Sequence, residues 1–418
     1  MRHLRPELVW YAYEGVASFL SALVFTVTAV YFVTELDMSP FQLVVVGTVM
    51  ELAIFVFEVP TGIVADTYSR RLSIVIGNAV MGLGFLLVGG IEAVWAVLAG
   101  YAVWGLGWTF TSGAMDAWLA DEAGLEHVNR LYLRGAQVGR VGSIAGIGAA
   151  VGLGLVDLRL PIIVGGAGFV LLAGFYALAM SERGFEPLDR EERGSFSQMA
   201  HTGRAGARLV RARPVLLAIL GIAAFAGMWS ESYDRLWQAH VIRDVGLPSV
   251  GGLEPIVWFG LFALVGLALA IVVAQPLERM LSDVPPPRLA RTLFALDAVL
   301  LVSSLVFALA GQLWLAMLGS FTLFLARNLA APIFDAWLNR SIDESSVRAT
   351  VISITNQADA VGQWVGGPAL GAVGNVFGIR AALVAGAACL LPALGLYRRA
   401  ARHGGRDPGL GSLEPVEP

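Results

Sequence analysis

Lysine is absent from this 418-residue chain, and cysteine occurs once, at Cys389. Without lysine the chain cannot form a lysine-dependent phosphate-binding loop or a lysine Schiff base. One cysteine excludes an internal disulfide and any zinc site made of several cysteines. The five histidines are scattered, and a formal net charge of −4 argues against general nucleic-acid binding. We therefore expect no cofactor, no metal site, no nucleic-acid partner and no enzymatic activity.

Charged residues are also scarce, at 14% of the chain, whereas soluble domains have about 25%. Hydrophobic residues make up 57%, and the mean hydropathy is +0.71. Apolar runs of about twenty residues recur along the chain, and a helix of that length spans a hydrocarbon core of about 30 Å. The runs are continuous rather than alternating, which disfavours an outer-membrane barrel. The composition predicts an all-α polytopic membrane protein.

Twelve transmembrane helices are predicted, in two sets of six. The first set lies near residues 8–34, 41–65, 72–92, 94–120, 130–156 and 160–180. The second set lies near residues 214–242, 253–278, 288–310, 312–338, 347–376 and 378–399. We expect an N-terminal six-helix bundle at 1–180, a central linker at 181–213, a C-terminal six-helix bundle at 214–399 and a disordered tail at 400–418. Few large apolar residues occur at 181–213, which favours a linker over a regulatory domain.

Arginine sets the predicted orientation. With an even number of helices, both termini and the linker lie on one side of the membrane, and that side carries 22 of the 28 basic residues. The loops on the opposite side hold only Arg159, Arg243 and Arg380. Because cytoplasmic loops collect arginine, both termini, the linker and the tail are predicted to be cytoplasmic.

The two sets of helices share a short repeat. The tetrapeptide Asp-Ala-Trp-Leu begins at Asp116 in the fourth predicted helix and again at Asp335 in the tenth, 219 residues later. Parallel halves related by an axis along the membrane normal are a known transporter design, with the substrate site between the halves near the bilayer midplane. The repeat therefore indicates two duplicated halves and favours a transporter.

The loop between the second and third predicted helices contains a glycine, an aspartate four residues later, and then a basic pair. It reads Gly62-Ile-Val-Ala-Asp66-Thr-Tyr-Ser-Arg70-Arg71. This loop resembles the motif of the major facilitator superfamily, whose fold is twelve helices in two pseudo-symmetric six-helix bundles. Two positions depart from that motif, because Thr67 stands where an arginine is usual and Ser69 where a glycine is usual.

The resemblance implies a gate at this loop. In the family the motif aspartate caps a helix of the opposite half, so Asp66 would accept hydrogen bonds at the N-terminus of the eleventh predicted helix, where the helix dipole favours an anion. The motif's basic residue pairs with an acid at the foot of the fourth helix, so Arg70 would pair with Asp116 or Asp121. These contacts would close the cytoplasmic side and break when it opens. The alternative is a simple turn with basic topology signals.

The similarity to the drug-efflux branch of the family, the 12-span drug:proton antiporters, is partial. The arginine that this branch carries in its fourth helix is replaced by Trp108, whose counterpart 219 residues later is Arg327. The glycine-rich run of the branch's fifth helix contains proline. Here the fifth predicted helix has glycines without proline, whereas the eleventh contains Gly367-Pro368. These runs imply either an antiporter-type bend or close helix packing.

Charged residues inside the predicted helices need a partner or a cavity, because a charge at the bilayer centre costs about 3 kcal/mol. The candidates for proton coupling or for the cavity are Glu14, Glu51, Arg140, Glu231, Asp234, Arg235, Arg327 and Asp359. A carboxyl that binds and releases a proton is what a proton-coupled carrier needs, and we favour Glu14 and Glu231 for that role. The alternative is an ion-pair network that links helices. Asp297 lies in a helix that is normally peripheral, and no role is assigned to it.

Aromatic residues also lie on the helices that line the cavity in this family. They are Trp104, Trp108, Trp229, Tyr233 and Trp237. An aromatic and partly acidic cavity would suit lipophilic or cationic organic molecules. The alternative is that these rings serve packing or membrane-interface belts.

These features predict a secondary active transporter of the bacterial inner membrane that works by alternating access, as a monomer in the lipid bilayer. Proton-coupled efflux of small organic compounds or drugs is the favoured function, with protons and a small-molecule substrate as partners. The alternatives are a proton symporter or uniporter that imports a small metabolite and, in another class, a non-transporting membrane sensor. An ATP-driven pump is disfavoured because the sequence has no Walker-type loop.

Overall fold

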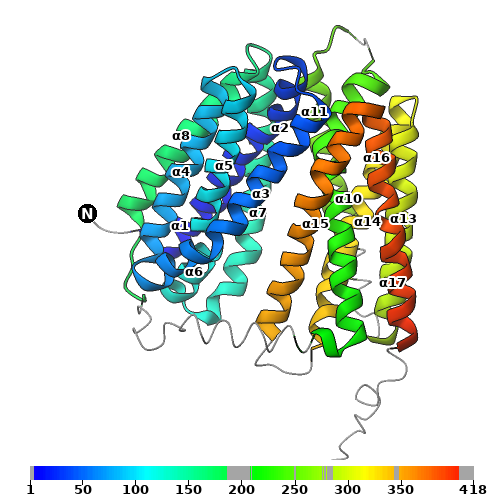
Figure 1. Cartoon of the computed structure of the whole chain (residues 1–418). Coiled ribbons are helices and arrows are strands. Elements are labelled where there is room, and N and C mark those ends of the chain that lie inside the picture. Colours follow the sequence, from blue (N-terminus) through cyan, green and yellow to red (C-terminus); the bar gives the residue numbers. More distant parts are fainter. Residues whose placement is uncertain are drawn as a thin grey trace, which may run out of the picture. The chain divides into compact units, whose positions relative to one another are not determined.

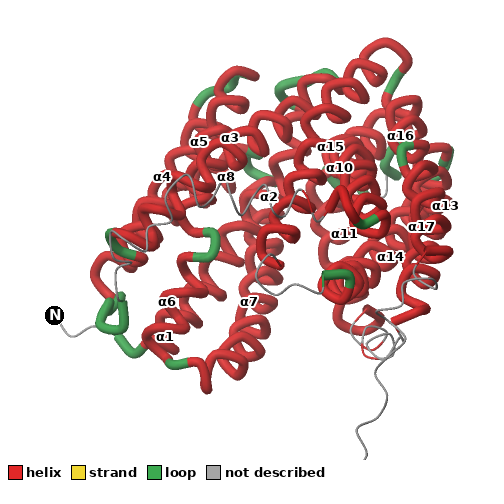
Figure 2. The backbone as a smooth tube through the Cα atoms, turned by 60° about the horizontal axis from the view of Figure 1, so that its bottom comes forward, coloured by secondary structure: helices red, strands yellow, loops and turns green. Residues whose placement is uncertain are grey.

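The structure, a computed structural model, describes residues 4–185, 208, 210–248, 251–274, 276, 279, 286–342 and 348–403. Over these residues the chain forms helices joined by short loops and contains no strand (Figure 1, Figure 2). The all-α prediction is confirmed. Most of the predicted linker at 181–213 and most of the predicted tail at 400–418 lie outside the described residues.

All twelve predicted spans contain helices. Eleven of the described helices are long and apolar enough to cross a membrane by length and composition. The remaining span is α15 (Arg348–Phe377), which has 30 residues. It is less apolar because polar side chains, among them Asn356, Asp359 and Gln363, are distributed along it.

The first compact unit, unit 1, consists of Met1–Arg193 and Leu247–Val265. Its helices are α1 (Pro6–Ala12), the π-helical turn η1 (Tyr13–Ala17), α2 (Ser18–Thr34), α3 (Pro40–Thr67), α4 (Arg70–Gly90), α5 (Val94–Thr111), α6 (Ala114–Ala123), α7 (Leu125–Gly154), α8 (Arg159–Ala179) and most of α11 (Pro255–Leu269). By sequence α11 falls in the second set of helices. It packs on α7, because Gly260 leaves room for the side chain of Val151.

The second compact unit, unit 2, consists of Gly194–Gly246 and Gly266–Pro418. In addition to α15, its helices are α10 (Pro214–His240), the π-helical turns η2 (Val241–Val245) and η3 (Ala270–Ala274), α13 (Pro286–Leu309), α14 (Leu313–Arg340), α16 (Ile379–Ala388) and α17 (Leu390–His403). The two compact units therefore differ from the two predicted six-helix bundles mainly at α11, most of which belongs to unit 1 although it follows α10 in the sequence.

The fourth span is broken in unit 1 and unbroken at the equivalent point of unit 2. The span predicted at 94–120 is present as Val94–Ala123, but it consists of two helices, because α5 ends at Thr111 and α6 begins at Ala114. Gly113 adopts φ = 71° between them, a left-handed conformation that glycine tolerates. The residue 219 positions later is Pro332, which lies inside the continuous helix α14.

Glycines bring α7 against the first span in unit 1. A Cβ atom at Gly142 would collide with the carbonyl oxygen of Gly15, and one at Gly146 would collide with that of Phe19. The two contacts are four residues apart on each helix, which is one turn. The glycine-rich run of the fifth span thus allows close helix packing.

The same arrangement recurs in unit 2 between α10 and α15. A Cβ atom at Gly362 would collide with the carbonyl oxygen of Ala224, and one at Gly366 would lie 2.6 Å from the Cγ atom of Met228. The spacing is again four residues on each helix. Both halves of the chain therefore pack their first and fifth spans in the same way.

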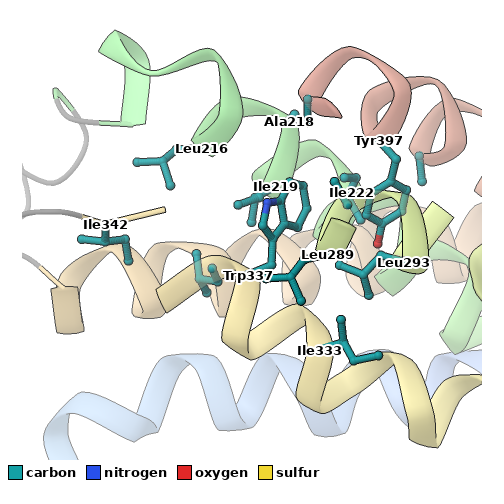
Figure 3. Close-up of a cluster of buried hydrophobic side chains, with 14 of the residues drawn as sticks. Leu216, Ala218, Ile219, Ile222, Leu289, Leu293, Ile333, Trp337, Ile342 and Tyr397 are labelled. Carbon is teal, nitrogen blue, oxygen red and sulfur yellow. The ribbon is translucent and has the colours of Figure 1, made fainter. Parts of the chain in front are cut away.

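A buried cluster anchors one end of unit 2 (Figure 3). Trp337 from α14 packs on Tyr397 from α17, with ring centroids 5.7 Å apart. Ile219 from α10 and Leu293 from α13 are fully buried beside them. Four spans of unit 2 are therefore held together around one indole ring.

The Asp-Ala-Trp-Leu repeat has the same burial pattern in both units. Trp118 and Trp337 are buried, whereas Asp116 and Asp335 are exposed. In unit 1 the indole Nε1 of Trp118 donates to the carbonyl oxygen of Ser181 at 2.6 Å. The repeat thus places a packing tryptophan and an exposed acid at the end of an equivalent helix.

Arg159, one of the three arginines that depart from the predicted charge asymmetry, caps a helix in unit 1. It begins α8 and donates to the carbonyl oxygens of Gly89 at 2.8 Å and Gly90 at 3.1 Å, at the C-terminus of α4. It also forms an ion pair with Glu92. A cation at a helix C-terminus satisfies free carbonyl groups and interacts favourably with the helix dipole.

Arg380 has the corresponding place in unit 2. It lies in the first turn of α16 and donates to the carbonyl oxygen of Ala310 at 3.4 Å, directly after α13, and to that of Asp244 at 3.1 Å. Two of the three arginines in the opposite loops, Arg159 and Arg380, therefore bind equivalent helix termini.

Candidate functional site

The motif loop between α3 and α4 places Arg70 against the fourth span. Its guanidinium forms an ion pair with Asp121 and donates to the carbonyl oxygen of Ala117 at 2.8 Å. Of the two predicted partners, Asp121 is the one in contact. Asp116 lies in the first turn of α6, where it interacts electrostatically with Glu14 and Tyr132 instead.

Of the two departures from the family motif, the one at Ser69 has a structural explanation. Its hydroxyl caps the N-terminus of α4 by accepting from the Leu72 amide at 2.9 Å, and it donates to Glu182 at 2.6 Å. The backbone amide of Arg71 also donates to Glu182, at 3.1 Å. Thr67 is buried at the end of α3. Sequence reasoning missed Glu182, since it follows the sixth span and is distant in the chain.

Residues 181–185 bind back onto this end of unit 1. Glu122 accepts hydrogen bonds from the Ser181 hydroxyl and from the Gly184 amide, the latter at 2.7 Å. The Arg70 guanidinium lies 5.7 Å from the ring centroid of Phe185. The start of the predicted linker is therefore fastened to the residues of the motif.

The other motif residues make fewer contacts. Asp66 is exposed near the end of α3, and Gly62 has open space where a Cβ atom would lie. The guanidinium of Arg71 donates to the carbonyl oxygen of Ala177. The capping role of Asp66 toward the eleventh span stays a prediction.

Unit 1 contains a cavity of about 380 Å³ among its first, third, fourth, fifth and sixth spans. Its lining combines hydroxyl, amide and carboxylate groups with aromatic rings, and among the described residues it includes no arginine or histidine. The polar and aromatic members of the lining are Tyr13, Glu14, Ser18, Ser21, Phe25, Asn78, Trp104, Trp108, Thr111, Ser143 and Phe169. Trp104 and Trp108 therefore line a cavity, as one of the two interpretations expected.

Glu14 lies in this cavity on the π-helical turn η1. Single π-helical turns are rare and often occur at functional sites. Gly135 and Gly139 of α7 make room for the carboxyl group, because a Cβ atom at Gly139 would lie 3.1 Å from its Oε2 atom. Within the part of the chain that the structure describes, Glu14 has no hydrogen bond or ion pair. Another acid, Asp116, interacts with it electrostatically.

The fourth span contributes a pair of stacked rings. Trp104 and Trp108 have centroids 5.6 Å apart and an interplanar angle of 17°. Phe25 meets Trp104 edge-on at 5.7 Å, so Trp104 is held on two sides. Trp108 is 42% exposed and offers a free ring surface.

Glu231 and Asp234 of unit 2 are paired with arginines, in contrast to Glu14. Arg327 donates to both carboxylate oxygens of Asp234, at 2.8 and 2.9 Å. Arg235 donates to Glu231 at 3.2 Å, and Glu231 is 2% exposed. Asp359 accepts from Gln363, a neighbour one turn along α15. These contacts favour an ion-pair network for this group.

The aromatic candidates of unit 2 take part in packing. Trp229 is buried, stacks on Tyr233 with centroids 6.0 Å apart, and donates to Ser304 at 3.0 Å. The hydroxyl of Tyr233 is hydrogen-bonded to Ser320 at 2.7 Å. Arg327 lies 5.5 Å from the Trp229 ring centroid, a cation–π contact.

Three further candidates, Glu51, Arg140 and Trp237, are half-buried. Their predicted roles in coupling or in the cavity stay predictions. Asp297, which had no assigned role, is buried and hydrogen-bonded to Tyr397. It therefore stabilises the junction of α13 and α17, and only the tertiary contact could show this.

The all-helical fold, with eleven described helices long and apolar enough to cross a membrane, is that of a polytopic membrane protein. Residues 15–356 match the family described as Major Facilitator Superfamily, and the chain belongs to that family. The predicted resemblance is thereby confirmed at the level of the superfamily. Its members are transporters, which places the protein among membrane transporters.

Individual proteins resemble this chain in sequence or in structure. The chain is 22% identical over 390 residues to the uncharacterized MFS-type transporter YxaM of Bacillus subtilis, covering 93% of this chain and 94% of that protein. The structure resembles that of the nucleoside transporter NupG, with a TM-score of 0.74 and 11% sequence identity. The match covers 95% of this chain and 99% of NupG. It also resembles a POT family transporter in complex with a thioalcohol-conjugated peptide, with a TM-score of 0.70, 13% identity and coverage of 96% of each chain.

Proposed function

We propose that the protein is a proton-coupled exporter of small organic compounds that works by alternating access, as a monomer, in the bacterial inner membrane. One observation carries the proposal: Glu14 lies in the unit 1 cavity with no basic partner among the described residues. The drug-efflux branch of the superfamily is the group that fits this activity.

Proton binding follows from the cost of an isolated charge in a membrane span. An ionised carboxylate there is unfavourable unless a cation, a hydrogen-bond donor or a proton compensates it. Glu231 already has Arg235 at 3.2 Å, and Asp234 has Arg327. Glu14 therefore takes precedence over Glu231 as the proton carrier.

The same carboxylate explains how a proton could be exchanged for a bound compound. Ionised Glu14 can pair with a cationic group of a bound compound or accept a charge-assisted N–H hydrogen bond, and protonation removes the charge that makes either contact strong. A proton that enters Glu14 then favours release of the compound, which is the logic of an antiporter. The gate of this cycle is proposed to include Asp66, Arg70 and Asp121, whose contacts must change between the two access states.

A second candidate is proton-coupled import of a small metabolite. NupG is a nucleoside transporter and the POT structure holds a peptide conjugate, so structurally similar proteins handle polar organic molecules. The hydroxyl and amide groups of the unit 1 cavity are compatible with such a cargo.

Purified protein in liposomes that contain a pH-sensitive dye tests both candidates. Lipophilic cations, antibiotics, nucleosides and peptides are added in turn, with and without an imposed pH gradient. We expect a substrate-dependent proton movement that is lost in Glu14→Gln and kept, at a reduced rate, in the matched variant Glu231→Gln. Proton and substrate moving in opposite directions would support export, and movement in the same direction would support import. Transport of labelled compounds without proton movement would contradict both.

A further inference from the structure

The first span contributes a polar face to the unit 1 cavity. Glu14, Ser18 and Ser21 follow one another at intervals of four and three residues, which places them on the same side of a helix. All three line the cavity, and so does Ser143 of α7. A Cβ atom at Gly139, one turn before Ser143, would lie 3.0 Å from the Oγ atom of Ser18 and 3.1 Å from the Oε2 atom of Glu14. Polar groups of the first span and of α7 therefore lie near one another.

The serine hydroxyls of this lining are accessible and have no partner within the protein. Over the described residues, the hydroxyls of Ser18, Ser21 and Ser143 form no hydrogen bond, and none of them is a fully enclosed atom. The three side chains are half-buried. The hydroxyl of Thr111, in the same lining, differs because it donates to the carbonyl oxygen of Trp108 at 2.9 Å. A ligand that displaces water from the three serines loses affinity unless it replaces the hydrogen bonds of that water.

The polar face is longer than one functional group. Seven residues separate Glu14 from Ser21, which is a rise of about 10 Å along the first span. A single ammonium group that pairs with Glu14 therefore leaves the hydroxyl of Ser21 without a partner. Each serine hydroxyl donates one hydrogen bond and accepts others, and a hydroxyl group of a ligand can answer both. This face therefore favours a compound that carries an amine and several hydroxyl groups.

We infer that the unit 1 cavity binds polyhydroxylated amines, a class that includes the amino sugars. The protonated amine donates to Glu14, and the hydroxyl groups pair with Ser18, Ser21 and Ser143. Aromatic rings in the rest of the lining offer apolar contact to the C–H groups of the compound. The carboxylate of Glu14 disfavours anionic compounds. A volume of about 380 Å³ is in the range of cavities that hold small organic ligands.

This inference rests on the proposed function, because it names the cargo class of the same cavity. Binding alone tests it, by isothermal titration calorimetry with the purified full-length protein. The probes are glucosamine, cyclohexylamine, which has the amine on a ring without hydroxyl groups, and glucose, which has a hydroxyl group in place of the amine. We expect glucosamine to bind at least about tenfold more tightly than either analogue, because each hydrogen bond contributes a factor of about 3 to 10 and one to a charged group contributes more.

Two variants assign the preference over cyclohexylamine to the first span. Ser18→Ala and Ser21→Ala are each expected to weaken glucosamine binding about 3- to 10-fold and to leave cyclohexylamine binding unchanged. Thr26→Val is the matched control and should change neither. It also removes a hydroxyl from the first span, but that hydroxyl donates to the carbonyl oxygen of Ala22 at 2.6 Å and does not line the cavity.

The unaltered protein decides the question even if a variant does not fold. A failure to bind glucosamine would overturn the inference, and so would binding of either analogue as tightly as glucosamine. If the serine variants fold and keep the full preference over cyclohexylamine, the inference is likewise overturned.

The outcome is separable from that of the proposed function. Selective binding of glucosamine without proton movement in liposomes would contradict the proposed function and support the binding site. Proton-coupled transport of other compounds, with no preference among the three probes, would do the reverse.

Discussion

At the scale of single residues, the ion pair between Arg70 and Asp121 can contribute to the stability of the fold and to the gating of transport, and the two contributions can be measured separately. Both side chains are partly exposed, at 20% and 26%. Ion pairs of that exposure contribute about 1 kcal/mol or less to stability. A large effect on transport with a small effect on stability would therefore indicate gating.

We predict that Arg70→Gln and Asp121→Asn each lower the unfolding temperature by only a few degrees and reduce transport by at least about tenfold, a factor that corresponds to 1.4 kcal/mol. The charge exchange Arg70→Asp with Asp121→Arg should restore part of the transport, because it re-forms the pair but loses the contact of Arg70 with Ala117. Uptake into liposomes and thermal unfolding measure the two effects. Normal transport by both single variants would exclude the pair from the gate.

The sequence could identify Arg70 and two possible acids but could not choose between them. Asp116 and Asp121 are five residues apart, so on one helix their side chains point about 140° apart. Only one can face α4, and the helix rotation that decides this is set after the break at Gly113. Likewise, the sequence suggested both Glu14 and Glu231. The i,i+4 spacing on one helix already allows the pair of Glu231 with Arg235 that the structure contains, whereas the surroundings of Glu14 depend on tertiary contacts.

At the scale of elements, the glycines of α7 offer a matched test of close packing. Gly142 meets the backbone of η1, whereas a Cβ atom at Gly148 would meet nothing within 4 Å. We predict that Gly142→Ala lowers the free energy of unfolding by about 1–3 kcal/mol, the usual cost of overpacking. Gly148→Ala should be neutral or slightly stabilising, since alanine is the better helix former. Equal effects in denaturant unfolding would contradict the packing assignment.

The helix cap formed by Arg159 gives a second prediction about elements. Arg159→Ala removes two carbonyl contacts at the end of α4 and should lower stability by about 1 kcal/mol or more. Arg134→Ala, at an exposed position of α7, is the control and should change stability by less than about 0.5 kcal/mol. If the two variants unfold at the same temperature, Arg159 does not stabilise the terminus.

The sequence predicted the helices well because apolar length is a local property. Their interruptions were less predictable. Gly113 and Pro332 occupy equivalent positions, yet the glycine ends a helix and the proline, usually the stronger helix breaker, lies within one. The π-helical turn that carries Glu14 also leaves no sequence signal, since it depends on packing against α7.

At the scale of the whole molecule, the two halves share their packing but differ in their charges. Glycine contacts four residues apart join the first and fifth spans in each unit. Unit 1 keeps Glu14 without a basic partner among the described residues, whereas the acids Glu231 and Asp234 of unit 2 are paired with arginines. The two halves are thus chemically asymmetric, which is why proton coupling is proposed for unit 1 alone.

The orientation of the chain in the membrane, with both termini in the cytoplasm, is a prediction about the whole molecule. It rests on arginine asymmetry, and two of the three arginines on the minority side are explained by capping of α4 and α13. After Cys389→Ser removes the single cysteine, Asp157→Cys and Glu126→Cys each place one thiol at an exposed position at opposite ends of α7. A membrane-impermeant maleimide added to intact cells should label Asp157→Cys at once and Glu126→Cys only after permeabilisation. The reverse pattern would place the termini outside and would require that arginine, in this chain, marks the external face.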